Sequence, residues 1–261
     1  MEKVMKVLNT DIDLELFFMQ IKRAERKALL LDYDGTLAPF QVDPANALPY
    51  PGVHEILNKI LQRHDIRLVI ISGRWTKDLL PLLQLNKNPE VWGSHGLEHL
   101  KSDGSYEIES IDEKFLDALV SANEWVDRIG LANRYEKKPG CLAIHWRGLD
   151  RREVADIKNK IDSKRALITK NWGLRLIDFD GGMEIRVPGI NKGNAVRKIL
   201  DEMEKETVAA YLGDDLTDED AFKAIKGDGI GLLVREEFRP TEADIWIKPP
   251  DELLSFLSGW I

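Results

Sequence analysis

Short apolar runs alternate along the chain with stretches in which apolar residues recur every three or four positions. Residues 11–27 show this helical spacing, and a continuous apolar run at 28–31 follows directly. Two further apolar runs, 66–71 and 208–212, also follow stretches of helical spacing. Helices that alternate with short buried strands are typical of α/β proteins, so the pattern predicts a parallel sheet.

A polar cluster follows each of these three apolar runs. The clusters read DYDGT after the first run, SGR after the second and GDDLTDED, residues 213–220, after the third. In open parallel sheets the ligand-binding crevice lies outside the carboxyl ends of the strands. We therefore expect the three clusters to meet in space and to form the functional site.

The middle of the chain, between residues 101 and 187, has a different pattern. Two stretches of helical spacing there are rich in charged residues: 112–129 and 151–164. Three short segments that begin with glycine have the pattern of strands: 140–147, 173–178 and 182–187. The last two predict a hairpin around Asp180, Gly181 and Gly182. We interpret this region as a small α+β module inserted into a larger one.

The composition is that of an ordinary globular protein. The chain has 261 residues, of which 43% are hydrophobic and 31% charged, and its net charge is −8. This balance indicates neither nucleic acid nor an anionic membrane as a partner. Cys141 is the single cysteine, which excludes an intramolecular disulfide and a cysteine-based zinc cluster. Since the N-terminal segment has no signal-peptide pattern and no apolar run is long enough to span a membrane, we expect a cytoplasmic protein.

Asp32 and Asp34 stand directly behind a predicted buried strand, where two carboxylates repel each other and lose water at a cost. In such a turn Asp32 could attack phosphorus and form an aspartyl-phosphate. Asp34 could protonate the leaving alcohol and then activate water. This chemistry needs a cation, and Mg²⁺ prefers oxygen ligands such as the carboxylates of residues 213–220. A simple turn is the alternative interpretation, since short acids are common where strands end.

Three other segments each have an ordinary interpretation beside a functional one. Ser72, Gly73 and Arg74 could form a simple turn, or could bind a phosphate through a hydroxyl and backbone N–H groups. Lys192 could be a surface lysine, or could screen a nucleophile and phosphoryl oxygens. The acidic segment 213–220 could be a solvated helix N-terminus, or could hold the cation. The buried strands before these clusters favour the functional interpretation.

Four segments, in their order along the chain, resemble the haloacid dehalogenase superfamily of aspartate-dependent phosphatases: the turn with Asp32 and Asp34, residues 72–74, the segment with Lys192, and residues 213–220. A longer set of matches, across residues 14–257, resembles the trehalose-6-phosphate phosphatase family: LDYDGTLAP, IISGR, GSHGLE, HWR, MEIR, NKG and YLGDDLTDEDAF. The resemblance implies an α/β fold, with a Rossmann-like parallel-sheet core at 1–100 and 188–261 and an inserted smaller α+β cap domain at 101–187. It also implies a Mg²⁺-dependent phosphatase that releases trehalose from trehalose 6-phosphate, with the cap closing over the sugar.

The resemblance also assigns roles to residues of the core. It implies Asp32 as the nucleophile and a Mg²⁺ ligand, and Asp34 as the acid/base with its backbone carbonyl on the metal. It implies Asp214 as a further ligand, supported by Asp215 and Asp218. The core residues implied to bind the phosphoryl group or the rest of the substrate are Thr36, Ser72, Gly73, Arg74 and Lys192.

A second set of residues is implied to lie in the cap and to meet the sugar hydroxyls: Glu98, Glu136, Lys138, His145, Arg147 and Glu184. Charged side chains suit a sugar with many hydroxyl groups because they form strong hydrogen bonds. The ordinary interpretations are a strand histidine for His145 and a cross-strand ion pair for Arg147 with Glu184.

The sequence departs from the family at one position that bears on which sugar the protein binds. The family usually has a basic residue three or four positions before Glu184, where this chain has Asp180 and Gly181, so that sugar contact is either missing or supplied by Lys170 or Arg175. The phosphate of another sugar or of a glycosyl-glycerate is therefore an alternative substrate. A non-catalytic sugar-phosphate sensor and a phosphotransfer mutase are alternatives of other classes. The oligomeric state is left open.

Overall fold

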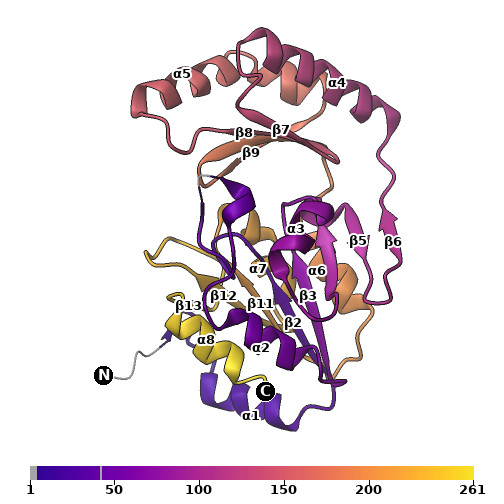
Figure 1. The fold of residues 1–261 in the computed structure, drawn as a ribbon, viewed down its shortest axis with the longest axis vertical. Helices are drawn as coiled ribbons and strands as arrows, with labels where there is room; N and C mark the ends of the chain where they lie inside the picture. Colours follow the sequence, from indigo (N-terminus) through magenta and orange to yellow (C-terminus); the bar gives the residue numbers. More distant parts are fainter. Residues whose placement is uncertain (1–4, 42) are drawn as a thin grey trace. The chain divides into compact units, whose positions relative to one another are not determined.

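The computed structural model describes residues 5–41 and 43–261 and divides the chain into two compact units (Figure 1). The core unit consists of Met1–Glu107 and Asn191–Ile261, and the cap unit of Ile108–Ile190. Both junctions lie later in the chain than the expected boundaries of 101 and 187. The first junction is later because β6 (Tyr106–Ile108) still belongs to the sheet of the core. Residues 1–4 and 42 of the expected core lie outside the described residues.

The core unit contains a nine-stranded sheet in which strands far apart in the sequence are neighbours. In order across the sheet the strands are β1 (Lys6–Val7), β13 (Ile245–Ile247), β12 (Gly229–Val234), β11 (Val208–Gly213), β2 (Lys27–Leu31), β3 (Ile66–Ile71), β4 (Glu90–Gly93), β5 (Glu98–Leu100) and β6. The strands from β13 to β4 run parallel, whereas β1 and β5 pair antiparallel with β13 and β4. The predicted parallel sheet is confirmed.

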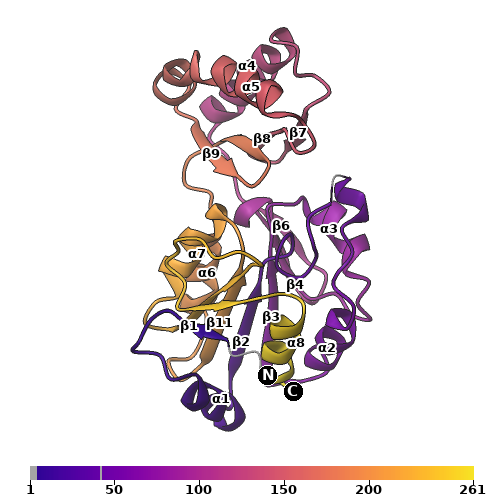
Figure 2. The ribbon, with the colours of Figure 1, turned by 90° about the vertical axis from the view of Figure 1, so that its left-hand side faces the viewer.

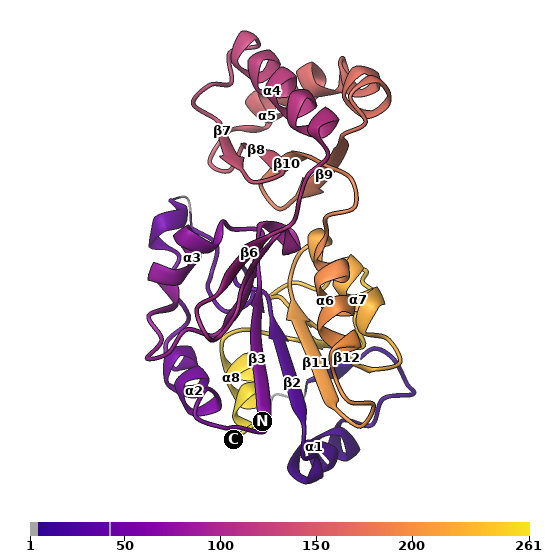
Figure 3. The same ribbon diagram turned by 90° about the vertical axis from the view of Figure 1, so that its right-hand side faces the viewer.

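Helices cover both faces of the core sheet because side chains alternate between its faces. The helices of one face are α1 (Leu14–Arg23), α2 (Val53–Ile60), α3 (Thr76–Leu83) and α8 (Asp251–Ser258). Those of the other face are α6 (Lys192–Asp201) and α7 (Glu219–Ile225). In β2, Leu29 and Leu31 pack with the first group, and Ala28 and Leu30 with the second. Figures 2 and 3 show the strands between α8 and α6.

Short turns of 3-10 helix connect some of these elements. They are η1 (Pro44–Asn46), η2 (Ser94–Gly96) and η4 (Leu216–Asp218). Among the described residues, no helix is long and apolar enough to cross a membrane.

The first helix ends earlier than the predicted range of 11–27. α1 stops at Arg23, and Lys27 is already the first residue of β2. Lys27 is buried because its ammonium group pairs with Asp65 and donates to the backbone carbonyl of Ala24 at 2.7 Å. The prediction was wrong at this end because apolar spacing does not reveal a paired lysine inside a buried strand.

The cap unit is built on a four-stranded antiparallel sheet. Its strands, in order across the sheet, are β7 (Tyr135–Lys138), β8 (Cys141–His145), β10 (Gly182–Arg186) and β9 (Arg175–Phe179). Its helices are α4 (Glu113–Arg128), α5 (Arg151–Asp162) and the π-helical turn η3 (Leu167–Asn171). Gly182 pairs with Phe179, which confirms the hairpin predicted around Asp180. β7 was not predicted, because its sequence YEKK has no apolar alternation.

The two faces of the cap sheet differ in polarity. Leu142, Ile144, Met183 and Ile185 form one face and pack in a core with α4 and α5. Residues next to these in sequence point to the other face. Charged side chains therefore gather on that second face: Glu136, Lys138, His145, Glu184 and Arg186.

Candidate active site at the carboxyl ends of the core strands

The three predicted polar clusters meet at one edge of the core sheet, as expected. Asp32 follows β2, Ser72 follows β3 and Asp214 follows β11, and these three strands are neighbours in the order β11-β2-β3. The carboxylates of Asp32 and Asp214 each have an oxygen within 4.8 Å of the other. Arg74 of the SGR cluster forms an ion pair with Asp34 of the first cluster. The topology of the parallel sheet therefore assembles the site from distant segments.

Asp32 is buried, with 3% of its surface exposed, and faces the ammonium group of Lys192. The distance from Lys192 Nζ to Asp32 Oδ1 is 2.6 Å. Burial and the charge of Asp218 raise the pKa of Asp32 to about 7, although Lys192 opposes this shift. Burial alone would lower the pKa of Lys192, but Asp218 and Asp32 together hold it above its ordinary value. Thr36 Oγ1 lies 3.5 Å from Asp32 Oδ2.

Asp214 is buried at 1% exposure, and neither of its carboxylate oxygens has a hydrogen-bond partner among the described residues. Arg235 Nη1 lies 3.7 Å from Asp214 Oδ2. Burial and the charges of Asp32 and Asp218 raise the pKa of Asp214 well above its ordinary value. A buried carboxylate without hydrogen bonds is costly unless a cation binds it.

Gly35 makes room for this carboxylate. A Cβ atom at position 35 would lie 2.2 Å from Asp214 Oδ2, and Gly35 has a φ of +79°. A glycine in the DYDGT turn thus permits both the left-handed backbone and the close approach of Asp214 to the first cluster.

Asp218 lies near the same two carboxylates, but its oxygens are already used within the chain. Oδ1 accepts from Lys192 Nζ at 2.7 Å and from the hydroxyl of Tyr211. Oδ2 accepts from the backbone N–H groups of Asp214 and Asp215 at 3.1 and 2.9 Å. Asp218 therefore organises the acidic turn, whereas Asp32 and Asp214 have the carboxylate oxygens suited to a divalent cation.

Asp215 is the N-cap residue of η4 and stabilises the same turn. Its side chain accepts a hydrogen bond from the backbone N–H of Leu216 at 2.7 Å and forms a reciprocal capping box with Asp218. Of the three buried aspartates after β11, Asp215 and Asp218 hold the turn, whereas the oxygens of Asp214 accept no hydrogen bond from the described residues.

Asp34 and Arg74 form a bidentate ion pair. Arg74 Nε and Nη2 lie 2.6 and 2.7 Å from the two oxygens of Asp34. The backbone N–H of Arg74 also donates to Ser72 Oγ at 3.1 Å. The sequence analysis gave Arg74 a role on the substrate, and the structure adds a contact with Asp34 that spacing alone does not reveal. The guanidinium group orients the Asp34 carboxylate.

The strand-end turn at residues 72–74 is closely packed. Ser72 is 1% exposed, and its backbone N–H donates to the carbonyl of Trp92 at 2.9 Å. A Cβ atom at Gly73 would lie 2.6 Å from Cε1 of the His95 ring, so only glycine fits here without a shift. The turn therefore holds the Ser72 hydroxyl in one place beside Arg74.

The charged residues implied for the sugar lie together on the polar face of the cap sheet. Lys138 Nζ lies 3.6 Å from Glu136 and 3.9 Å from Glu184, and His145 Nε2 lies 3.5 Å from Glu136. Arg186, which the sequence analysis did not select, lies 3.4 Å from Glu184. Apart from Glu98 and Arg147, the residues of this set form one cluster.

Arg147 and Glu98 lie elsewhere. Arg147 Nη2 donates to the backbone carbonyl of Asp180 at 2.5 Å and lies 3.6 Å from its carboxylate. Glu98 belongs to the core unit, so its expected place in the cap was wrong. It is fully buried on β5, where it accepts hydrogen bonds from Tyr106 at 2.9 Å and from the backbone of Thr76 at 3.3 Å.

Two residues at the core site were missed by the sequence analysis. Tyr211 binds Asp218 from within the apolar run VAAYL, where it cannot be distinguished from a core residue. Arg239 binds the main chain of the acidic turn from a loop that contains no recognisable motif. Neither has a signal in one sequence.

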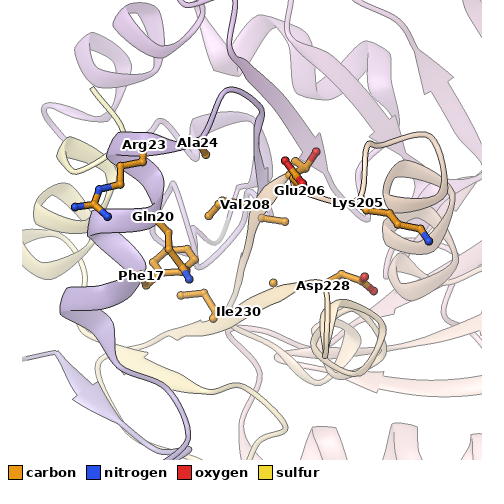
Figure 4. Close-up of a pocket in the computed structure, with 12 residues that line it drawn as sticks. Phe17, Gln20, Arg23, Ala24, Lys205, Glu206, Val208, Asp228 and Ile230 are labelled. Carbon is orange, nitrogen blue, oxygen red and sulfur yellow. The ribbon is translucent and has the colours of Figure 1, made fainter.

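A cavity of about 500 Å³ lies at the opposite end of the core strands (Figure 4). It is lined by α1, by the beginning of β11 at Val208 and by the beginning of β12 at Gly229. Figure 4 shows Phe17 and Ile230 together, with Arg23, Lys205 and Asp228 around them. None of the candidate site residues lines this cavity.

Comparison with known proteins identifies relatives over nearly the whole chain. The family model described as trehalose-phosphatase matches residues 30–243. The probable trehalose-phosphate phosphatase 2 of Oryza sativa subsp. japonica is 28% identical over 270 residues, which cover 92% of this chain and 69% of that protein.

Solved structures share the fold. The C-terminal domain of C. albicans trehalose-6-phosphate phosphatase has a TM-score of 0.82 and 23% identity, with 100% of both chains covered. A haloacid dehalogenase-like hydrolase from Bacteroides thetaiotaomicron has a TM-score of 0.62 and 16% identity, covering 89% of this chain and 98% of the other. These likenesses confirm the predicted α/β fold.

Proposed function

Since this chain belongs to the trehalose-phosphatase family, a family of phosphatases, we propose that it hydrolyses trehalose 6-phosphate to trehalose and phosphate. We place the chemistry on Asp32, through an aspartyl-phosphate, with Mg²⁺ as the cofactor. The observation that carries this proposal is the pair of buried carboxylates, Asp32 and Asp214, beside Lys192. Family membership supports the substrate, and the site geometry supports the mechanism.

The residues at the site fit a divalent cation. Within residues 5–41 and 43–261 nothing hydrogen-bonds to the two buried oxygens of Asp214, and an oxygen of Asp32 lies within 4.8 Å of one of them. The carboxylates of Asp32 and Asp214 and the backbone carbonyl of Asp34 would hold the ion. When bound, Mg²⁺ neutralises the charge that the nucleophile and the phosphoryl group would otherwise bring together.

In the first step an oxygen of Asp32 attacks phosphorus, and the bond between phosphorus and the sugar oxygen breaks. The sugar oxygen takes a proton from Asp34 as it leaves. Lys192, with its ammonium group 2.6 Å from Asp32, stabilises the negative charge on the nucleophile and on the phosphoryl oxygens. Ser72 and the turn 72–74 bind the phosphoryl group from the neighbouring strand.

In the second step water attacks phosphorus, Asp34 takes a proton from that water, and the bond between phosphorus and Asp32 breaks. Free phosphate leaves, and both aspartates return to their initial state. Arg74 holds both oxygens of Asp34 as a carboxylate, so Asp34 has to give up one of these bonds and take up a proton before the first step, and it regains that proton from water in the second. Arg74 thereby positions the acid/base.

Chemical trapping tests the covalent intermediate. Acid quenching during turnover of trehalose 6-phosphate, followed by borohydride reduction, should convert residue 32 to homoserine, because borohydride reduces an acyl phosphate to an alcohol. Peptide mass spectrometry locates the change, and a sample quenched without substrate is the control. Phosphate release without homoserine at position 32 would rule out the proposed nucleophile.

The pKa of Asp32 predicts how metal binding depends on pH. Its folded pKa of about 7 lies above the ordinary value of 3.8, so a proton competes with the cation below pH 7. Below pH 7 the apparent Mg²⁺ affinity should fall about tenfold per pH unit for every proton that metal binding displaces. Calorimetric titration with Mg²⁺ between pH 5 and 8 measures this dependence. A constant affinity over that range would contradict it.

The polar face of the cap sheet supports a role in sugar binding. Glu184 has only 4% of its side chain exposed and lies beside Arg186 and Lys138, so replacing its charge changes the cluster without opening a cavity. Glu184→Gln should raise the KM for trehalose 6-phosphate about tenfold, because a charged hydrogen bond becomes a neutral one. The KM for p-nitrophenyl phosphate should stay within about twofold.

The exposed glutamate of α4 provides a matched control, since Glu124→Gln makes the same chemical change on the same unit. It should leave both KM values at the wild-type level. If Glu184→Gln raises the two KM values equally, Glu184 does not contact the sugar.

One observation favours a different sugar. Asp180, at the position where the family has a basic residue, accepts a hydrogen bond from Arg147 through its backbone carbonyl. Its carboxylate also lies 3.6 Å from the same guanidinium group. Arg147 is therefore held by the hairpin turn, and another sugar or glycosyl-glycerate phosphate remains the second candidate substrate. The same phosphatase chemistry would serve it.

A further inference from the structure

Arg239 lies in the segment between β12 and β13, and its guanidinium group contacts the acidic turn at residues 214–218. Its Nε donates to the backbone carbonyl of Asp214 at 3.2 Å, and its Nη2 to that of Asp215 at 2.7 Å. Its Nη1 pairs with the carboxylate of Glu219 at the start of α7. Only 15% of the side chain is exposed, so the charge has lost most of its water in exchange for these contacts.

We propose that Arg239 is a positioning residue for the metal site: it holds the main chain of Asp214 and Asp215 so that the Asp214 carboxylate faces Asp32. This inference rests on the proposed function, because it assigns Arg239 to the cation that this function requires. Arg239 does not touch the substrate or the reacting atoms in this proposal. It acts through the backbone of Asp214.

Asp214 depends on such support more than its neighbours do. No hydrogen bond within the described residues holds its carboxylate, and Arg235 approaches it only to 3.7 Å, so contacts at the tip of the side chain fix its direction weakly. The position of the backbone must therefore set where the oxygens point. A metal site needs this precision, because its affinity depends on ligands that are already oriented.

The backbone of the turn is held from two sides. On one side, Asp218 Oδ2 accepts from the N–H groups of Asp214 and Asp215. On the other side, Arg239 donates to the carbonyl groups of the same two residues. Asp218 belongs to the turn itself, whereas Arg239 is more than twenty positions away in the sequence. Arg239 therefore ties the main chain of the turn to another part of the core.

Arg239 is itself firmly anchored. Glu219, which pairs with it, also accepts from Thr241 Oγ1 at 2.8 Å and from the backbone N–H of Glu242 at 2.7 Å. The charge of Arg239 is thus balanced by Glu219 and does not reach the Asp214 carboxylate to compete with a cation. Its planar fork presents separate nitrogen atoms to the two carbonyl groups in a fixed geometry, which the single nitrogen of a lysine does not.

Binding of Mn²⁺, a spectroscopic stand-in that also takes oxygen ligands, tests the proposal without any substrate. Free Mn²⁺ would be measured by electron paramagnetic resonance with the full chain and with Arg239→Met and Arg239→Lys. We expect Arg239→Met to raise the Mn²⁺ Kd about tenfold, as loss of an outer contact does at other metal sites. Arg239→Lys, which keeps the charge and one donor, should have a smaller effect.

The control is Arg67→Met, which removes another arginine of the core with comparable ion pairs. Arg67 pairs with Glu90 and Glu202, and 27% of its side chain is exposed. Arg67→Met should lower the melting temperature and leave the Mn²⁺ Kd unchanged. A purely structural role for Arg239 would give this same result.

The outcomes distinguish a failure of the role proposed for Arg239 from a failure of the proposed metal site itself. A Mn²⁺ Kd within twofold of the wild type in Arg239→Met overturns the role of Arg239, and so does an equal rise in Arg67→Met. If Arg239→Met does not fold, Arg239→Lys decides by the same criterion. If the wild type itself binds no Mn²⁺, the proposed metal site fails together with this inference.

Discussion

Asp32→Asn is expected to lower the rate of trehalose 6-phosphate hydrolysis at least about 10³-fold, the order of loss seen when a nucleophile is removed from a catalytic unit. An amide oxygen is a poor nucleophile and cannot form the acyl phosphate on which the proposed mechanism depends. Lys192 also contacts Asp218 at 2.7 Å, a hydrogen bond that does not involve residue 32, so the core around the site should stay folded in this variant.

The rate should be followed as phosphate release, with circular dichroism and thermal melting as checks on the fold. Asp220→Asn is the matched control, since Asp220 is an exposed acid in the same segment after β11 and should keep the wild-type rate. A folded Asp32→Asn protein with normal turnover would remove the nucleophile from the account.

Asp214→Asn is expected to abolish metal binding and yet to stabilise the metal-free protein. The variant loses one of the two buried carboxylates proposed to hold Mg²⁺. It also loses a buried acid whose pKa is raised by burial and by Asp32 and Asp218. A neutral amide is less costly to bury than such a group.

Proton binding determines whether Asp214 stabilises or destabilises the metal-free protein at neutral pH. Because the folded pKa of Asp214 is raised, the native state binds more protons than the unfolded state between the ordinary and the raised value. The free energy of unfolding therefore falls as pH rises through that range, and Asp214→Asn lacks this loss. At neutral pH the metal-free variant should melt above the metal-free wild type.

Thermal melting with and without Mg²⁺ measures both effects. The wild type should gain stability with Mg²⁺, because a ligand that binds only the native state shifts unfolding, whereas Asp214→Asn should not. The outcome against the proposal is a variant that melts below the wild type in the absence of metal and still responds to Mg²⁺. Asp220→Asn again serves as the control.

The meeting of the three polar clusters could be predicted from the sequence because one physical rule connects the apolar pattern with the place where the clusters lie. Buried apolar runs predicted parallel strands, and polar clusters behind neighbouring parallel strands meet at one edge of the sheet. The closeness of Asp32 and Asp214 follows from that topology, because they come directly after the neighbouring strands β2 and β11. No side-chain detail was needed to bring these segments together.

Contacts made by long side chains were not predictable in the same way. Arg74 reaches Asp34, and Arg239 reaches the carbonyls of Asp214 and Asp215, through rotamers that spacing in one sequence does not determine. The strand β7 was missed for a related reason. Glu136 and Lys138 lie on the polar face of the cap sheet, and Lys137 puts a further charge on the opposite face, so no apolar alternation revealed the strand.

Fold and family do not by themselves establish that this chain turns over a given sugar, since function depends on the site. The central claim is therefore tested most directly by Mg²⁺-dependent phosphate release from a panel of substrates. The panel contains trehalose 6-phosphate, glucose 6-phosphate, sucrose 6-phosphate, mannosylglycerate phosphate and p-nitrophenyl phosphate.

The account predicts that trehalose 6-phosphate has the highest kcat/KM, by at least about 100-fold over glucose 6-phosphate, because a site built for sugar hydroxyls rejects substrates that leave its polar groups unpaired. It also predicts no release once the metal is removed with a chelator. A higher kcat/KM for another substrate would contradict the assigned sugar, and no release from any substrate with Mg²⁺ present would contradict the enzymatic function.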